Sequence, residues 1–304
     1  MRERYAAQVG LLVRLVPLVA RETEFALKGG TAINLFHRNL PRYSVDIDLV
    51  YTPIKDRASS LSAITQGLDR LAGSINDARL GAQASRIAGG GNQDTRLLVR
   101  ADGATVKIEV SPVLRGTLFE PEPMRVHHGV EQRFGFAEMQ VLSHDELFAG
   151  KLVAALDRAH PRDLFDVHHL LANDGFTDGL FRTFLIYLVS SGRPMHELLN
   201  PSAVDITTAY HQEFSGMAAD ELPLDVLYAA RQKLVAELRQ RLTGRAASFL
   251  ESVHQCEPRF ELIGLPQAAR LPAVRWKLRN LQAFKENDPD RHADQRSALK
   301  ALFS

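Results

Sequence analysis

The sequence predicts an α+β fold, with a small mixed sheet and helices over residues 1–142 and an α-helical domain over residues 143–304. Short segments in which apolar and polar residues alternate lie between residues 25 and 110, which is the period of strands. After Ser143, apolar residues recur at helical spacing. The chain has 304 residues, 45% of them hydrophobic and 24% charged, which is enough for two modest domains.

Composition excludes several classes of protein. No stretch approaches the roughly 18 to 20 uninterrupted apolar residues of a membrane span, and residues 1–14 lack the layout of an export signal. We therefore expect a cytoplasmic protein with no membrane partner. Cys256 is the single cysteine, which excludes an internal disulfide and a thiolate zinc site.

The first predicted elements are a helix over residues 5–21 and a strand over residues 25–27. Gly29-Gly30 ends this strand, and we expect Thr31 to cap a helix over residues 32–38. A glycine turn between a strand and a helix lets backbone N–H groups approach a phosphate, because the helix N-terminus carries positive potential.

The next predicted strand covers residues 45–51. Its alternation places Asp46 and Asp48 on one face, about 6.5 to 7 Å apart along the backbone. Two carboxylates at this spacing suit one or two Mg²⁺ ions, which activate the attacking oxygen and stabilise the leaving oxygen in phosphoryl displacement. Taken alone, the same pattern is also that of a solvated polar face.

Two further strands, over residues 96–100 and 105–110, are predicted to form a hairpin through Asp102-Gly103. Glu109 projects from the polar side of the second strand, so it is a candidate third metal ligand. The glycine-rich segment 89–92 is expected to be a surface loop, and residues 113–139 are expected to be rich in loops.

The spacing of apolar residues becomes helical after Ser143. Ser143 and Glu146 have the spacing of a helix capping box. The domain boundary is placed there. Helices are predicted from apolar stripes at residues 148–156 and 164–171, and further along the chain over residues 180–190, 224–242 and 275–286.

The glycine turn, the two aspartates and the third acid together serve one reaction, and this arrangement resembles the polymerase-β-like nucleotidyltransferase superfamily. A finer resemblance is to the AbiEii/AbiGii nucleotidyltransferase toxins, to which the mycobacterial MenT toxins also belong. Three stretches carry it: Leu27-Lys28-Gly29-Gly30-Thr31-Ala32, then Arg42-Tyr43-Ser44-Val45-Asp46-Ile47-Asp48-Leu49, then Lys151 with Arg158 and Arg162-Asp163-Leu164-Phe165-Asp166.

The resemblance implies roles for these residues. Asp46 and Asp48 are expected to hold metal, with Glu109 as the third ligand. Lys151 and an acid of the Asp163/Asp166 pair are expected to be needed for activity. The expected nucleotide-binding residues are Lys28, Gly29, Gly30, Thr31, Arg42 and Ser44. From the residues alone, a surface lysine is the preferred interpretation of Lys151, and a structural ion-pair cluster is as good an interpretation of the two acids as direct catalysis.

The resemblance also implies the activity. An acceptor hydroxyl would attack the α-phosphorus of a nucleoside triphosphate with Mg²⁺, releasing pyrophosphate, in a groove between the two domains. The expected acceptor is an RNA 3′ end, in particular tRNA, and the expected partner is a separate antitoxin protein. The alternatives are transfer to a small molecule or a protein side chain, and a catalytically silent binding module.

A basic stretch late in the chain is a candidate RNA surface. Residues 226–285 hold 11 basic and 4 acidic residues, and within them residues 270–285 hold five basic residues and no acidic one. Trp276 and Phe284 are interleaved, so phosphate neutralisation and base stacking are both available. The alternative is a cationic helix that buries its aromatic residues. The basic residues are Arg270, Arg275, Lys277, Arg279 and Lys285.

Overall fold

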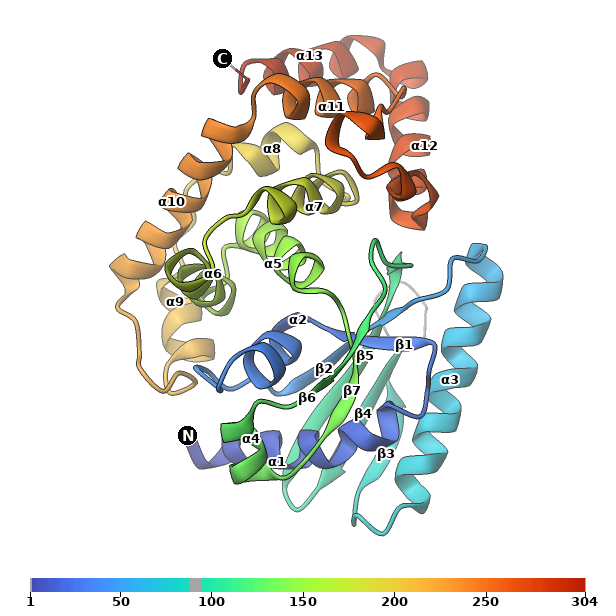
Figure 1. Ribbon diagram of the computed structural model, residues 1–304, viewed down its shortest axis with the longest axis vertical. Coiled ribbons are helices and arrows are strands. Elements are labelled where there is room, and N and C mark those ends of the chain that lie inside the picture. Colours follow the sequence, from blue (N-terminus) through green and yellow to red (C-terminus); the bar gives the residue numbers. More distant parts are fainter. Residues whose placement is uncertain (1, 88–94, 304) are drawn as a thin grey trace. The chain divides into compact units, whose positions relative to one another are not determined.

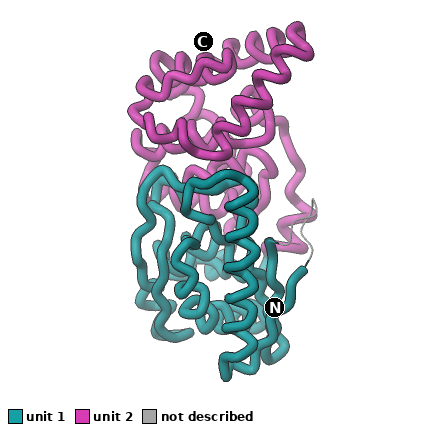
Figure 2. Tube along the Cα trace, turned by 90° about the vertical axis from the view of Figure 1, so that its right-hand side faces the viewer, with its two compact units in different colours: residues 1–147, 215–221 teal, residues 148–214, 222–304 magenta. Residues whose placement is uncertain are grey.

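The computed structural model describes residues 2–87 and 95–303, and its chain forms two compact units (Figures 1 and 2). The first unit comprises residues 1–147 and 215–221, and the second comprises residues 148–214 and 222–304. The first unit therefore ends at residue 147 rather than at the expected 142, and it takes in a short segment from the later half of the chain. The glycine-rich segment 89–92 lies outside the described residues.

The first unit contains the strands. Its elements in chain order are α1 (Arg2–Val19), β1 (Phe25–Lys28), α2 (Gly29–Thr31) with a π-helical continuation (Ala32–His37), β2 (Asp46–Tyr51), α3 (Arg57–Asp77), β3 (Gln83–Ile87), β4 (Arg96–Ala101), β5 (Ala104–Arg115), β6 (Glu122–Arg125), α4 (His128–Phe134) and β7 (Glu138–Val141).

Within the described residues these strands form a seven-stranded mixed sheet in the order β3-β4-β5-β2-β1-β7-β6. β2 is parallel to β5 and β1 is parallel to β7, whereas the other neighbours are antiparallel. Helix α1 packs on β5 and β7, and α3 packs on β3 and β4 (Figure 1). The predicted mixed sheet with helices is confirmed.

Alternation decides which side chains enter the core. Ile47 and Leu49 of β2 are fully buried, as are Val106 and Ile108 of β5. Because side chains alternate along a strand, the residues between them point to the other face. This places the acidic positions of both strands on one side of the sheet.

The prediction that residues 113–139 are rich in loops is wrong in part. β5 continues to Arg115, and β6, α4 and β7 follow within this segment. Pro123 lies in β6, which is the last strand in the sheet order. An edge strand tolerates proline because one of its sides needs no ladder hydrogen bonds, so the proline did not exclude a strand here.

Thr31 does not cap the following helix, contrary to expectation. The helical segment already begins at Gly29, and Thr31 has helical dihedral angles of −67° and −44°. Its side chain is used for tertiary contacts instead. The capping box at Ser143 is confirmed, because the N–H of Glu146 donates to Ser143 Oγ (3.4 Å).

The second unit is helical, as predicted. Helix α5 (His144–Arg158) begins in the first unit, and it is followed by α6 (Pro161–Asn173), α7 (Asp178–Val189), α8 (Met195–Leu199), α9 (Thr207–Ala209) with a π-helical turn (Tyr210–Phe214), α10 (Leu224–Arg241), α11 (Gly244–His254), two 3₁₀ turns (Phe260–Ile263 and Pro266–Arg270), α12 (Pro272–Asn287) and α13 (Pro289–Lys300).

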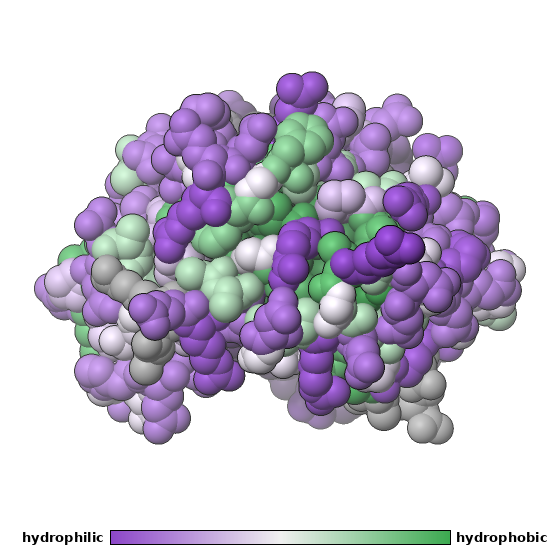
Figure 3. All heavy atoms as spheres, turned by 90° about the horizontal axis from the view of Figure 1, so that it is seen from below, coloured by the Kyte–Doolittle hydropathy of each residue, from purple (hydrophilic) through white to green (hydrophobic). Residues whose placement is uncertain are grey.

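Among the described helices, none combines the length and the apolar composition needed to cross a bilayer. The surface that faces downward in Figure 1 carries mainly hydrophilic side chains, with apolar atoms visible between them (Figure 3).

Candidate active site

The first unit carries its acidic site on the polar face of β2. Asp46 and Asp48 are half-buried, whereas Ile47 between them is fully buried. The strand therefore has the alternation that the sequence predicts. Both carboxylates leave the same face of the sheet, beside the end of β1, where Lys28 lies opposite Asp48.

Gly29 and Gly30 bring the backbone directly against the site. Gly29 has a φ of +76°, which L side chains rarely adopt, and a Cβ there would lie 2.7 Å from Asp48 Oδ2. A Cβ on Gly30 would lie 2.8 Å from Arg42 Nη2 and 2.9 Å from Ser44 Oγ. The helical segment also starts at Gly29, so its first N–H groups lack intrahelical acceptors and are available to an anion.

Thr31 joins this turn to the aspartate strand. Its hydroxyl is hydrogen-bonded to Ser44 Oγ (3.0 Å) and to the backbone carbonyl oxygen of Asp46 (2.5 Å). Thr31 is 1% exposed, so these bonds are shielded from water. The position of the glycine turn is thereby tied to the position of the first carboxylate.

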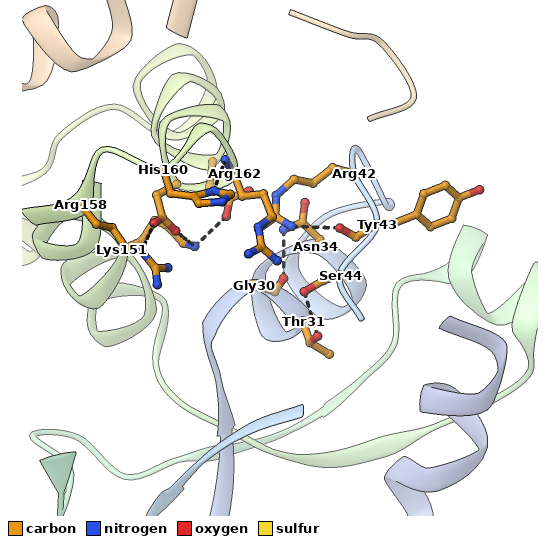
Figure 4. Close-up of polar contacts among 12 residues, drawn as sticks. Gly30, Thr31, Asn34, Arg42, Tyr43, Ser44, Lys151, Arg158, His160 and Arg162 are labelled. Atoms are coloured by element: carbon orange, nitrogen blue, oxygen red, sulfur yellow. Dashed lines mark hydrogen bonds and ion pairs between the residues drawn. The ribbon is translucent and has the colours of Figure 1, made fainter. Parts of the chain in front are cut away.

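Arg42 is directed at the same turn. Figure 4 shows its guanidinium pointing toward Gly30 and Asn34, whereas the ring of Tyr43 points away. Arg42 Nη1 donates to the carbonyl of Tyr43 (2.9 Å), and Asn34 Nδ2 donates to the carbonyl of Gly30 (2.9 Å). A buried cation beside helix N–H groups is suited to hold phosphate oxygens.

The segment Ser215–Glu221 fixes the loop that carries Arg42. The N–H of Tyr43 donates to the carbonyl of Met217 (2.8 Å), and the N–H of Ala219 donates to the carbonyl of Pro41 (2.9 Å). Arg42 and Ala218 are paired between these bonds in an antiparallel bridge. A strand-like contact from the later half of the chain thus belongs to the site.

The other side of this loop is also anchored. The ring of Tyr43 stacks on Tyr5 of α1 (centroids 6.1 Å apart), and its hydroxyl accepts a hydrogen bond from Arg133 of α4 (2.9 Å). An open cavity of about 340 Å³ lies here, lined by residues that include Leu40 and Met217. Contacts on both sides therefore hold the loop in place.

Glu109 on β5 lies directly opposite Asp48 on β2. Its carboxylate is ion-paired with Arg96 Nη2 (2.7 Å) and with Lys107 Nζ (3.0 Å). Burial would raise the pKa of Glu109, but these two cations outweigh it and hold the pKa below its usual value. Burial would likewise lower the pKa of Lys107, but the charges of Asp46, Glu109 and Asp48 raise it.

The donor set of this face fits a hard cation. Carboxylate oxygens are the ligands that Mg²⁺ prefers, and Gly29 leaves open the space next to Asp48 that a Cβ would fill. Within residues 2–87 and 95–303, no three acidic, histidine or cysteine side chains are gathered around one point as a metal centre. Asp46 and Asp48 could hold Mg²⁺ with water and phosphate oxygens as further ligands, because Mg²⁺ is usually bound through one or two carboxylates.

The second unit contains a separate cluster around Lys151 of α5. Its Nζ lies 2.6 Å from Asp163 Oδ1 and 3.0 Å from Asp166 Oδ2, and Arg158 Nε donates to Asp163 Oδ2 (2.7 Å; Figure 4). Lys151 is 8% exposed and Asp163 is 1% exposed. Burial would raise the pKa of Asp163, but the charges of Lys151 and Arg158 hold it far below its usual value.

The family model of the AbiEii toxin, a nucleotidyl transferase of type IV toxin–antitoxin systems, matches residues 10–280. The chain belongs to this family. The match spans the glycine turn, the aspartate strand and the Lys151 cluster. The toxin is therefore a nucleotidyltransferase, which implies a nucleoside triphosphate substrate and an antitoxin partner.

The fold is similar to that of MenT4, a nucleotidyltransferase toxin from Mycobacterium tuberculosis. The two chains are 16% identical, and the match covers 99% of this chain and 94% of that chain, with a TM-score of 0.59. This likeness confirms the predicted fold class of a mixed sheet followed by helices. A search of curated proteins found no match.

Helix α12 of the toxin corrects one sequence-based prediction. Lys277 was assigned to a basic surface with Arg275 and Arg279, but it is buried, and its Nζ donates to the carbonyls of Ser191 (2.9 Å) and Arg193 (2.6 Å). Burial lowers its pKa to about 8, although Glu197 opposes this shift.

The neighbours of Lys277 remain on the surface. Arg275 and Arg279 are exposed, and Trp276 between them is 56% exposed. Phe284, the second predicted aromatic residue, is half-buried, and its ring packs against that of His292 (centroids 5.8 Å apart). The basic surface of α12 is thus narrower than the sequence predicts, and of the two aromatic residues only Trp276 is exposed.

Sequence reasoning missed two parts of the site. Residues 215–221 carry no motif, and their pairing with residues 41–43 spans more than 170 positions, beyond the reach of local patterns. Lys107 belongs to no motif of the sequence, although it lies two residues before Glu109 on the same strand. The parallel pairing of β2 with β5 sets it opposite Asp46, and this register is decided by tertiary structure.

Proposed function

We propose that the toxin transfers nucleotides from a nucleoside triphosphate to the 3′ end of an RNA, in particular tRNA, with release of pyrophosphate. The reaction would take place in the cytoplasm and would depend on Mg²⁺ held by Asp46 and Asp48. One observation carries this proposal: two carboxylates leave one strand face directly against a glycine turn that begins a helix.

Each part of this face has a role in the proposed reaction. The first N–H groups at Gly29 and Gly30 would bind phosphate oxygens, together with Arg42 and Lys28. Thr31 and Ser44 would hold the turn against β2 through their shared hydrogen bond. Mg²⁺ would supply the activation of the attacking hydroxyl and the stabilisation of the leaving oxygen. Glu109 would serve as a third ligand only after its carboxylate turns from Arg96 and Lys107 toward the aspartates.

The Lys151 cluster is proposed to be required as well. Its ammonium is held by two buried carboxylates, which fixes the side chain in one position. This arrangement supports Asp163 and Asp166 as positioning residues for Lys151. A separate antitoxin protein is the expected partner of the toxin.

The exposed face of α12 supports an RNA acceptor. Arg275 and Arg279 offer positive charge, and Trp276 offers a flat ring on which an unpaired base can stack. Proteins that bind single-stranded nucleic acid commonly combine these two interactions. Transfer to a protein or a small molecule would need neither.

The experiment that tests this function incubates the full chain with each α-labelled nucleoside triphosphate, Mg²⁺ and total RNA, with Asp46→Asn as the inactive control. Label in tRNA-sized bands is the expected result. Label in protein or in small molecules would show that the acceptor is not RNA. Absence of label from every fraction would identify a silent binding module. Mg²⁺ removal by chelation should abolish the signal.

A further inference from the structure

The polar face of the sheet arranges charges in cross-strand rows. One row runs from Lys28 on β1 to Asp48 on β2, Glu109 on β5 and Arg96 on β4, each directly opposite the next. In the adjacent row, Asp46 lies opposite Lys107. Neighbouring strands are about 4.8 Å apart, so three carboxylates and Lys107 lie within a small area.

Lys107 is the cation at the centre of this group. It lies beside Asp46 across the parallel pair, and it is ion-paired with Glu109 two residues along its own strand. Asp46, Glu109 and Asp48 all attract its ammonium electrostatically. Its side chain is 35% exposed, so it is able to move when its surroundings change.

Like charges directly opposite each other on adjacent strands are destabilising. Asp48 and Glu109 form such a pair, and a cation is needed to compensate them. Arg96 reaches one oxygen of Glu109 at the far side of the row, whereas Lys107 faces the aspartates. Lys107 therefore serves the acids of β2 in a way that Arg96 does not.

We propose that Lys107 is an internal counter-cation that takes the electrostatic place of a metal ion and makes metal binding at Asp46 and Asp48 depend on the nucleotide. This inference rests on the proposed metal-binding role of those aspartates. A divalent cation arriving alone is repelled by the ammonium. A cation arriving with a triphosphate brings compensating negative charge, and the ammonium can turn toward that charge.

The test measures Mn²⁺ binding to the full chain by the electron paramagnetic resonance signal of free Mn²⁺, without nucleotide. Lys107→Met keeps the stem of the side chain and removes its charge. We expect it to bind Mn²⁺ about tenfold more tightly than the unmodified chain. Arg100→Met is the matched control, because it removes a charge from the polar face of β4 opposite Thr105, and it should change the affinity less than twofold.

A second measurement adds a non-hydrolysable triphosphate. The nucleotide should tighten Mn²⁺ binding more in the unmodified chain than in Lys107→Met, because the variant has already lost the repulsion that the nucleotide compensates. Lys107→Gln provides a second neutral variant, and thermal unfolding verifies that each variant is folded. Structural damage alone would weaken metal binding and would not strengthen it.

The outcomes separate this inference from the proposed function. Unchanged or weaker Mn²⁺ binding in both Lys107 variants overturns the inference, even where Asp46→Asn still abolishes binding and the metal site stands. Absence of Mn²⁺ binding in every chain, with and without nucleotide, overturns both. A gain that persists in the Lys107→Met, Asp46→Asn double variant places the cation elsewhere and also overturns the inference.

Discussion

Two clusters of carboxylates and cations differ in how much water reaches them. On the sheet, the side chains of Lys107 and Glu109 are 35% and 23% exposed. These two residues form an ion pair on one face of β5. On the helices, Lys151 and Asp163 are almost entirely buried. A half-exposed pair can exchange its partners at little cost, whereas a buried pair is locked, because an unpaired buried charge is strongly destabilising.

The difference in exposure suits the two clusters to different roles, the first to binding a ligand and the second to holding a side chain in position. The acids of β2 and β5 are accessible to a ligand that brings its own charge. Asp163 already has Lys151 and Arg158 as partners and is shielded from solvent. Substitutions in the first cluster should therefore change activity with little change in stability, and substitutions in the second should change both.

The largest expected effect is on catalysis. Asp46→Asn and Asp48→Asn should each reduce nucleotide transfer by about 10³-fold or more, because a neutral amide oxygen binds Mg²⁺ much more weakly than a charged carboxylate does. The melting temperature should move by only a few degrees. Asp77→Asn, an exposed acid at the end of α3, is the control and should leave transfer unchanged. Near-normal turnover of either variant at saturating Mg²⁺ would contradict the assignment.

The next effect distinguishes the two clusters by stability. Lys151→Met leaves Asp163 and Asp166 without their shared cation, which should cost about 3 to 5 kcal/mol in chemical denaturation. Lys107→Met, at a half-exposed site, should cost less than about 1 kcal/mol. Equal losses of unfolding free energy in Lys151→Met and Lys107→Met would contradict the predicted difference between the two clusters. Activity of Lys151→Met is measured at low temperature, where the variant is still folded, and we expect it to be lost there too.

How much was predictable from sequence follows the range of each contact. The two aspartates and the glycine turn are short local patterns that residue spacing singles out. Lys151 and the Asp163/Asp166 pair were singled out only by the resemblance to the AbiEii/AbiGii toxins. Thr31 was expected as a cap, since a local rule cannot anticipate a side chain that bonds to Ser44 and Asp46 across the site. Burial of Lys277 was missed for the same reason, because two carbonyls distant in sequence accept its hydrogen bonds.

A third prediction tests the backbone of the accessible site. Gly29→Ala should destabilise the chain by about 1 to 3 kcal/mol, because alanine is strained at a φ of +76° and its Cβ would meet Asp48 Oδ2. Transfer should fall more than stability explains, since Asp48 is displaced. Gly73→Ala in α3 is the control: nothing lies near its Cβ, and removing a helical glycine should stabilise slightly. Two alanine variants that behave alike would show that Gly29 is not under this constraint.

A fourth prediction applies the same contrast within α12. Replacing both Arg275 and Arg279 by glutamine should weaken RNA binding several-fold and flatten its salt dependence, because exposed cations release counterions from phosphates. Lys277→Gln should instead lower stability and leave the salt slope unchanged, because this lysine is buried against carbonyls. Triphosphate binding should stay constant in the double variant. A salt slope that responds to Lys277 and not to the arginines would reverse the assignment.

The smallest expected effect concerns a buried pair of rings in the second unit. His254 and His292 stack with centroids 4.2 Å apart, and the Nε2 atom of each is hydrogen-bonded to the backbone carbonyl of the other (3.0 Å). Burial lowers the pKa of His254 below its ordinary value of about 6.5, although the bond to the His292 carbonyl opposes this shift.

The sign of the pH effect follows from that lowered pKa. Below about pH 6.5 the unfolded chain takes up a proton at His254 that the folded chain does not yet bind, so stability falls as the pH falls through this range. Unfolding free energies at pH 7.5 and 5.5 should therefore differ more for the unmodified chain than for His254→Gln, by about 1 kcal/mol or less. The variant is expected to be less stable at pH 7.5. The test therefore compares the change in unfolding free energy between the two pH values, and not the unfolding free energy itself. If the unfolding free energies of the two chains fall equally between these pH values, burial does not keep His254 neutral in the folded chain.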